Sequence, residues 1–249
     1  MLHFYKFRQD LFGPVPARDV YAKRGPGKGW PEECPPLRAA NAFGYDILAN
    51  FDVTFVRRRD GTWRVEDDVV IDSDFDWSPD DDSDGQPLTQ QYAWFWAKGQ
   101  TVPHPITDNV HEQIRDQVKL SSFLYLKTDP NELLLMTEVP NRWKPWRVWS
   151  ALVDTDWYPA NYPWHAVLEL SPKEKRITIE KGEPVCRIIP VRRDTYFAGP
   201  MGTAAFDEFF ERGQRWLSVH GKPTDDKTTM DITRTYVKQQ ARSKFIVLD

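Results

Sequence analysis

The sequence is poor in cysteine and has no long apolar run, and both absences narrow the class of protein. Its 249 residues contain two cysteines, Cys34 and Cys186, too few for a disulfide framework. No apolar stretch approaches the roughly 20 residues needed to cross a bilayer. Residues 1–6 lack the apolar core of a signal peptide. We therefore expect a cytoplasmic protein without membrane association.

Positive charge is also in short supply. The 33 Lys and Arg residues are outnumbered by 37 Asp and Glu residues, which gives a formal net charge of −4. Because neutralising phosphates requires a clustered basic surface, this charge argues against a general nucleic-acid binder. Residues 142–149 do interleave bases with indoles, and such a run can stack single-stranded bases. With an acidic chain, cation–π packing in a loop that covers the core is the better interpretation.

Glycine is scarcer than proline, with 13 Gly against 20 Pro, which indicates short elements separated by rigid turns. Aromatic residues, in contrast, are abundant: 11 Trp, 14 Phe and 9 Tyr. Aromatic side chains supply large buried areas and favour strands. The composition therefore predicts a mainly β protein.

The pattern divides the chain into three parts. Residues 1–36 form an irregular, proline-rich arm, and residues 37–198 form a β core. An acid-dense insertion at about 66–86 interrupts this core, and we interpret it as a solvated, mobile loop. Residues 199–249 form a helical C-terminal appendage, in which the apolar spacing of 203–220 is that of a helix.

Individual elements can be predicted from alternation, turn residues and helical spacing. Residues 51–56 and 62–65 should form a hairpin around Asp60-Gly61. The other predicted elements are a strand at 2–7, a short polar helix at 107–119, a hairpin of 123–127 with 132–138, strands at 162–170, 176–180 and 185–191, a second C-terminal helix at 229–244 and a last strand at 245–248.

The stretch from Ala151 to Val191 organises the core. It opens with an apolar ramp into two acids and two aromatics, namely Asp154, Asp156, Trp157 and Tyr158. Strands that follow a carboxylate pair indicate a β-scaffold with acids at its rim. Asp154 and Asp156 are candidate catalytic residues, since a desolvated carboxylate can transfer protons. Alternatively, they accept backbone N–H bonds in a strand-entry turn.

Three segments, in order, resemble the trimeric dUTPase superfamily. Gly44-Tyr45-Asp46-Ile47 resembles its Gly-Tyr-Asp-Leu motif, and Ala151 to Trp157 resembles its Gly-Val-Ile-Asp-x-Asp-Tyr segment. Gly182-Glu183-Pro184-Val185-Cys186-Arg187 resembles its Gly-Asp-Arg-Ile-Ala-Gln turn and strand. The resemblance implies a β-clip fold, a distorted barrel of short strands, over roughly residues 37–193. It also implies a trimer, and Asp154 as the residue that activates water.

The chain departs from that superfamily where phosphates are held. The Arg-Ser-Gly motif should lie near residues 139–143 and is absent, and residues 221–249 contain no Gly-rich arm. Because a pyrophosphatase must hold several phosphate charges, we expect that activity to be lost.

The whole chain more closely resembles an uncharacterised bacterial domain family. The residues that carry this resemblance are Cys34-Pro35-Pro36-Leu37 with Ala40-Asn41, Val153 to Trp157, and Gly182 to Cys186 leading to Pro190. In that family a Glu usually precedes Thr-Asp-Trp, where this chain has Asp154. The resemblance implies no known activity.

Two functions are compatible with these observations. The first is small-molecule binding, by a protein that could be an enzyme of specialised or nucleotide-related metabolism. Its predicted ligand-binding residues lie around the two candidate catalytic acids and are Tyr45, Asp46, Arg142, Arg147, Trp157 and Tyr158. The second is a non-catalytic structural or protein-interaction module, including a homo-oligomer, since charge-rimmed aromatic clusters are typical of interfaces.

A redox or metal site is a third alternative. It would use Cys34, Cys186 and one of His104, His111 or His165, but their spacing matches no ligand motif. The sequence predicts no metal site and indicates no particular cofactor.

Overall fold

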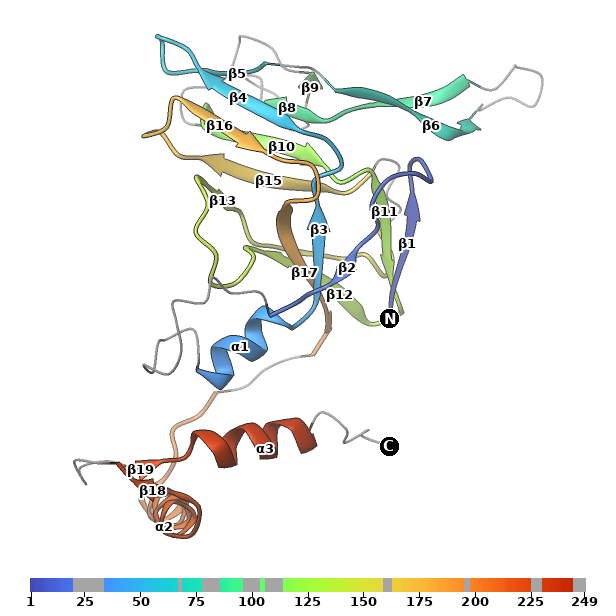
Figure 1. Ribbon diagram of the computed structural model, residues 1–249. Coiled ribbons are helices and arrows are strands. Elements are labelled where there is room, and N and C mark those ends of the chain that lie inside the picture. The colour runs from blue at the N-terminus through green and yellow to red at the C-terminus, as the bar shows by residue number, and fades with distance from the viewer. Residues whose placement is uncertain are drawn as a thin grey trace. The chain divides into compact units, whose positions relative to one another are not determined.

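The computed structural model confirms the mainly β class, because strands predominate among the described residues. The chain splits into unit 1, Met1–Asp19 with Asn41–Arg193, and unit 2, Val20–Ala40 with Asp194–Asp249 (Figure 1). No helix in the described part of the chain combines the length and apolarity that a bilayer crossing requires. The structure describes residues 1–19, 34–66, 69–77, 86–95, 104–105, 114–158, 163–194, 198–224 and 230–243.

Unit 1 contains the strands β1 to β17, and α1 (Pro35–Asn41) ends at its boundary. The strands are β1 (Leu2–Lys6), β2 (Val15–Pro16), β3 (Tyr45–Leu48), β4 (Val53–Arg57), β5 (Trp63–Val65), β6 (Val70–Trp77), β7 (Gln86–Gln91), β8 (Ala93–Phe95), β9 (His104–Pro105), β10 (Gln117–Ser121), β11 (Leu124–Thr128), β12 (Glu132–Thr137), β13 (Trp146–Val148), β14 (Ala151–Val153), β15 (His165–Leu170), β16 (Arg176–Ile179) and β17 (Pro184–Arg192).

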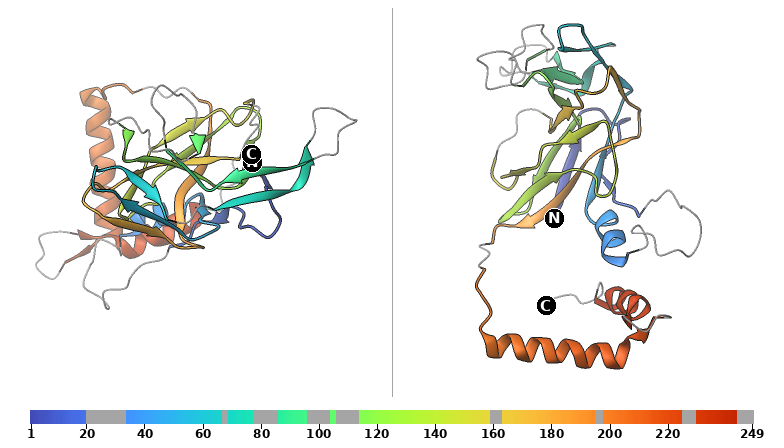
Figure 2. Two further views of the ribbon diagram at one scale, coloured as in Figure 1. Left: turned by 90° about the horizontal axis from the view of Figure 1, so that it is seen from above. Right: turned by 90° about the vertical axis from the view of Figure 1, so that its left-hand side faces the viewer.

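Two five-stranded sheets form most of unit 1, with the orders β14-β12-β17-β3-β2 and β13-β15-β10-β8-β9. A three-stranded sheet has the order β16-β4-β5, and β1 pairs with β11. The remaining pair, β6 and β7, projects from the other strands as a ribbon (Figures 1 and 2). The described strands form no closed barrel, so it is the mainly β class that the structure establishes.

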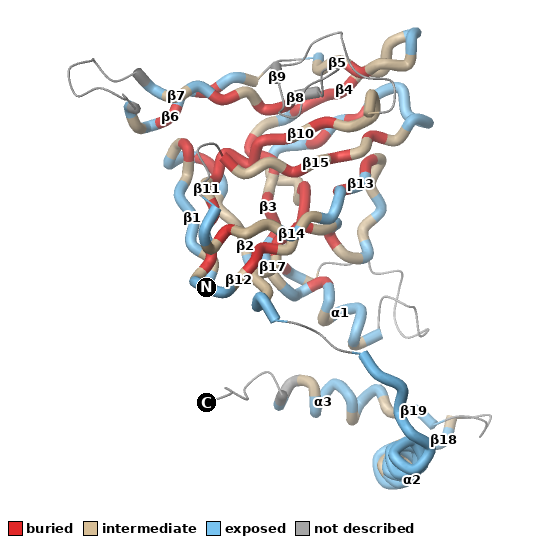
Figure 3. Tube along the Cα trace, turned by 180° about the vertical axis from the view of Figure 1, so that it is seen from behind, coloured by how far each residue is buried: buried red, intermediate tan, exposed pale blue. Residues whose placement is uncertain are grey.

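Buried residues of these strands fill the core of unit 1 (Figure 3). On β15, for example, Ala166, Leu168 and Leu170 are buried and the residues between them are only partly buried. Period-2 burial of this kind is what one apolar face of a sheet requires. Phe7, Phe51, Tyr92 and Phe123 add a cluster of tilted and edge-to-face rings, so part of the aromatic content is used to fill the core.

Positive φ angles favour glycine at Gly44 and at Gly61. Gly61 has φ +85° in the turn between β4 and β5, as the Asp60-Gly61 signal predicts. Gly44 has φ +87°, and a Cβ on it would lie 2.7 Å from the Ile188 carbonyl oxygen of β17. The glycine of the Gly44-Tyr45-Asp46-Ile47 segment therefore lets β3 start directly against β17.

A buried ion pair joins β3 to β17. Arg187 and Asp46 are register partners, and Arg187 Nε donates to Asp46 Oδ1 at 2.7 Å. The guanidinium also donates to the carbonyl oxygens of Phe43 (2.6 Å) and Asn41 (3.0 Å). Arg187 is 0% and Asp46 is 4% exposed. Because both charges are removed from water, the additional hydrogen bonds to the guanidinium are what makes this burial tolerable.

Two predicted elements, a hairpin and a helix, differ from the structure. The strands β11 and β12 are connected by the expected turn, with Asn131 at φ +68°, but they form no hairpin: β11 pairs with β1, and β12 pairs with β14 and β17. The helix predicted at 107–119 is wrong at its C-terminal end, because residues 117–119 belong to β10. This strand pairs with β15 on one side and β8 on the other, which buries Val118. Residues 106–113 lie outside the described residues.

The acid-dense stretch is also not simply a loop. Its residues 70–77 form β6, on which Asp72, Asp74 and Asp76 are exposed and alternate with Ile71, Ser73 and Phe75. The acids read as a charge run in the sequence, but their spacing of two is that of a half-solvated strand. Residues 67–68 and 78–85 of this stretch lie outside the described residues.

Unit 2, taken by itself, contains α2 (Thr203–His220), α3 (Thr233–Ser243) and the short pair β18 (Lys222–Pro223) and β19 (Met230–Asp231). Helices at these places confirm both C-terminal helix predictions. The helix α2 ends where the Gly221 N–H donates to the Leu217 carbonyl at 2.8 Å. The strand predicted at 245–248 lies outside the described residues.

The buried ion pair makes a first prediction. Arg187→Met should lower the free energy of unfolding by about 3–5 kcal/mol, because it leaves the Asp46 carboxylate buried without a counter-charge. Urea denaturation monitored by tryptophan fluorescence measures this loss. Arg176→Met is the matched control: Arg176 pairs with Glu66 at the surface, so its loss should cost less than about 1 kcal/mol. Equal costs for the two variants would refute the assignment.

Candidate functional site

The two candidate catalytic acids follow β14 and share one arginine. Arg193 Nη2 lies 2.6 Å from Asp154 Oδ1 and 2.8 Å from Asp156 Oδ1. The hydrogen bond to Asp154, together with that to Asp156, raises the pKa of Arg193. Arg193 directly follows β17, whose pairing with β12 brings it to the end of the sheet where β14 stops. The structure thus brings both acids together with a cation.

The segment from Asp154 to Tyr158 is fixed by its own turn and by β11. The Tyr158 N–H donates to the Asp154 carbonyl at 2.8 Å, which closes the turn. Thr155, which is buried, makes a hydroxyl–hydroxyl hydrogen bond of 2.8 Å with Thr128 at the end of β11. The Thr155 carbonyl accepts the Thr128 N–H at 3.2 Å. The threonine between the two acids therefore anchors this segment to β11.

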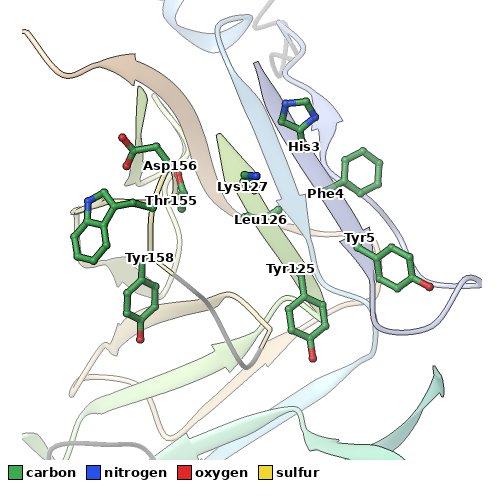
Figure 4. A pocket seen from close by; sticks show the side chains of 10 residues that line it. His3, Phe4, Tyr5, Tyr125, Leu126, Lys127, Thr155, Asp156 and Tyr158 are labelled. Carbon is green, nitrogen blue, oxygen red and sulfur yellow. The ribbon is translucent and has the colours of Figure 1, made fainter. Parts of the chain in front are cut away.

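This segment forms one wall of a depression of about 510 Å³, which we call the aromatic groove (Figure 4). Its floor is the β1–β11 pair, where His3 lies opposite Lys127 and Tyr5 opposite Tyr125. The rings of Tyr125 and Tyr158 point to the same side of the groove (Figure 4). The lining residues are His3, Phe4, Tyr5, Tyr125, Leu126, Lys127, Thr155, Asp156, Trp157 and Tyr158.

A second cavity of about 220 Å³ adjoins the groove, with which it shares Leu126, Thr155 and Tyr158. It lies between residues of the two five-stranded sheets, and we call it the inter-sheet pocket. One wall carries side chains of β10 and β15, and the other carries side chains of β12 and β14. The complete lining is Lys119, Leu126, Met136, Ala151, Val153, Thr155, Tyr158, Trp164, His165 and Val167.

Two basic residues of the inter-sheet pocket are shifted towards their neutral forms. Burial, with a smaller contribution from the charge of Lys119, lowers the pKa of His165 to about 3. Burial also lowers the pKa of Lys119. Gln90 Nε2 lies 3.2 Å from His165 Nε2. Because an amide NH₂ only donates, His165 Nε2 accepts this hydrogen bond, as a neutral imidazole can.

Two further predicted ligand residues do not lie beside the acids. Tyr45 and Asp46 are on β3, which β17 and β12 separate from β14. Three strand spacings amount to about 14 Å. Tyr45 is partly exposed, and its strand lies on the far side of the central strand β17 from β14. Asp46 forms an ion pair with Arg187. The Gly-Tyr-Asp-Ile segment therefore has a structural role here, because its acid serves the buried ion pair.

The basic residues of the Trp-rich run line a different hollow. Arg142 and Arg147 border a depression of about 480 Å³ that shares no lining residue with the aromatic groove. Arg147 Nη2 lies 3.1 Å from Glu169 Oε2, and Lys144 lies 5.3 Å from the ring centre of Trp146. The cation–π packing predicted for this run is therefore present, while Trp143 is fully exposed.

Among the described residues, those of the third alternative form no metal site. Cys186 is completely buried, and burial raises the pKa of its thiol to about 12, so the nucleophilic and metal-binding thiolate is disfavoured. Across the described residues, no three His, Cys, Asp or Glu side chains are grouped so that they could hold a metal ion. His111 lies outside the described residues, as does the side chain of His104.

Sequence reasoning missed the residues that complete the site. The sequence pattern predicts both β1 and β11 as strands, but strands that pair across about 120 positions leave no local signal of their pairing. The sequence pattern assigns Lys119 to a helix, and it suggests for His165 only a role as a metal ligand. Arg193 carried one usable signal: it is a cation at the end of a strand that was expected to pair within the core.

Comparison with known proteins adds no assignment: no family model matches the chain, and no curated protein matches it.

The shifted pKa of His165 predicts how stability depends on pH. Between pH 6.5 and about 3 the unfolded chain binds a proton at His165 and the folded chain does not, so acidification lowers the free energy of unfolding. This residue contributes up to about 1.4 kcal/mol per pH unit. His165→Gln should therefore show a shallower loss of stability between pH 6.5 and pH 5 in urea denaturation.

Nuclear magnetic resonance checks the same prediction directly. The ring signals of His165, assigned by their absence from His165→Gln, should not titrate between pH 8 and pH 5. A midpoint near 6.5 would show that the imidazole is solvated in the folded state.

Proposed function

We propose that this protein binds a small, ring-containing molecule in the aromatic groove. The observation that carries the proposal is that Asp156, Trp157 and Tyr158 line one cavity of about 510 Å³ together with the floor strands β1 and β11. That volume lies within the range of about 300–1,000 Å³ typical of ligand sites. Aromatic residues on both sides and a few polar groups are also typical of such sites.

The groove offers a mixture of contacts that suits a heterocycle. Tyr5, Tyr125 and Trp157 supply faces and edges for a ring. His3 and Lys127, which are adjacent across the floor, supply polar groups at one end. Asp156 is 9% exposed and held by Arg193, so it offers a fixed acceptor rather than a mobile one. A base or a related polar ring satisfies both kinds of contact.

The resemblance to dUTPases supports a nucleotide-related ligand on a β-clip-like scaffold, which we propose as the finer description of the fold. Because the phosphate-binding motifs are missing, the proposed ligand is recognised by its ring rather than by a triphosphate. A carboxylate next to such a ring can also move a proton, so we propose Asp156 and the half-exposed Asp154 as the acids of any reaction at this site.

The groove predicts the effect of a single aromatic truncation. In a thermal-shift screen of nucleosides, nucleotides and aromatic amino acids, a ligand that raises the melting temperature by mass action identifies the class. Trp157→Ala should then weaken binding of that ligand about 3–10-fold, because an aromatic pair contributes about 0.5–1.5 kcal/mol. Isothermal titration calorimetry measures the change.

Trp143→Ala is the matched control, since Trp143 is an exposed indole that lines the other hollow. It should leave the affinity unchanged. If no compound of these classes binds, or if both tryptophan variants bind equally well, the aromatic groove is not the ligand site.

One observation favours the interaction module as a second candidate. Taken by itself, unit 2 buries no residue of α2, and Phe206, Phe209 and Phe210 are each about half exposed. Exposed aromatic side chains that lie close together are frequent at interfaces. We propose that this face of α2 contacts a second copy of the chain.

Self-association through α2 has its own test. Analytical ultracentrifugation of the full chain should show a concentration-dependent oligomer that Phe209→Ser disrupts. A monomer at all concentrations up to about 100 µM, which corresponds to an association weaker than about −5.5 kcal/mol, would exclude this second candidate.

A further inference from the structure

We infer that Lys119 is a nucleophilic lysine that forms an imine with an aldehyde or ketone group of a ligand in the inter-sheet pocket. The inference deepens the proposed function and rests on it, because the pocket opens beside the aromatic groove and shares Leu126, Thr155 and Tyr158 with it. A ligand ring in the groove can thus present a carbonyl substituent to the pocket.

The sheet register places Lys119 in the wall of this pocket. Lys119 on β10 is the partner of Val167 on β15, and His165 lies two residues away on the same strand. Residues two apart on a strand share a face, so these three side chains point the same way. All three line the inter-sheet pocket. The position of Lys119 in the pocket wall is therefore fixed by the pairing of β10 with β15.

The surroundings favour the reactive form of the amine. The opposite wall is apolar, with Met136 on β12 and Ala151 and Val153 on β14. Removal from water disfavours the ammonium form, and burial accordingly lowers the pKa of Lys119. A lysine desolvated in an apolar pocket is one of the recognised ways to obtain an amine nucleophile near neutral pH.

The neighbouring groups fit imine formation. In this step the Nζ lone pair of Lys119 attacks the carbonyl carbon, a C–N bond forms, and the C=O π electrons move to oxygen. The carbinolamine then loses one water molecule, leaving a C=N bond. The hydroxyl of Tyr158, which lines both cavities, can donate a hydrogen bond to the oxygen that becomes negative. His165 stays neutral and adds no second positive charge beside the iminium.

The volume limits the carbonyl compound. An apolar cavity of about 150 Å³ is large enough to hold benzene. The inter-sheet pocket, at about 220 Å³, has space for one ring or a short chain next to Lys119. We therefore assign aldehydes and ketones of the size of benzaldehyde as the class that Lys119 accepts.

Reductive trapping tests the inference. The full chain is incubated with benzaldehyde and sodium cyanoborohydride at pH 7.5, and the benzylated lysines are located by peptide mass spectrometry over time. Cyanoborohydride supplies the hydride that converts the imine to a stable amine. Lys119 should be labelled at least about fivefold faster than Lys175, an exposed lysine beyond β15, because more of its amine is unprotonated.

Two variants make the result specific. Lys119→Met should lose the fast label, while Lys175→Met should keep it. The comparison within the wild-type chain needs no variant and holds even if Lys119→Met is unstable. Labelling of Lys119 at or below the rate of Lys175 overturns the inference but leaves ligand binding by the groove intact. Failure of the thermal-shift screen overturns the proposed function, and the labelling rate of Lys119 is measurable regardless.

Discussion

The buried pair of Arg187 and Asp46 is the constraint on which the rest of unit 1 depends. It joins the middle strands of the sheet β14-β12-β17-β3-β2 and fixes their register. A slip by one residue would separate the two buried charges and leave each without its counter-charge. Because β17 also pairs with β12, the same register determines where Arg193 emerges next to the two acids after β14.

The segments around Asp46 and around Asp156 contribute to unit 1 in different ways. Gly44, Asp46 and Arg187 are used to hold two strands together. The segment after β14 is different. Its Thr155 is hydrogen-bonded to Thr128 of β11, while Asp156, Trp157 and Tyr158 line the aromatic groove. Of these segments, one therefore holds two strands together, and the other lines a cavity.

Much of the fold could be predicted because its signals are local. Alternation located β4, strand-forming apolar runs located β12, β15 and β17, and turn chemistry located the hairpin at Gly61. Helical spacing and a terminal glycine located α2. Strand pairing could not be predicted, as β11 shows: it follows the short-range turn signal into β12 but pairs with the first strand of the chain. Which strands become neighbours depends on total burial, which no short window contains.

The candidate site divides in the same way. The sequence alone could single out Asp156, Trp157 and Tyr158, because an acid next to two aromatic residues is visible as a local pattern. The sequence could not single out Lys119 and His165. They come together only when the two five-stranded sheets pack and form the inter-sheet pocket. The desolvation that alters their pKa values arises only from packing.

Tyr158 lies where the aromatic groove and the inter-sheet pocket meet, so its side chain affects the shape of both. Its side chain is part of the partition between two volumes of about 510 and 220 Å³. Rotation about its χ1 bond reshapes both compartments at once, whereas the threonine pair at its base keeps the backbone still. The rotamer of Tyr158 therefore determines how much space the aromatic groove shares with the inter-sheet pocket.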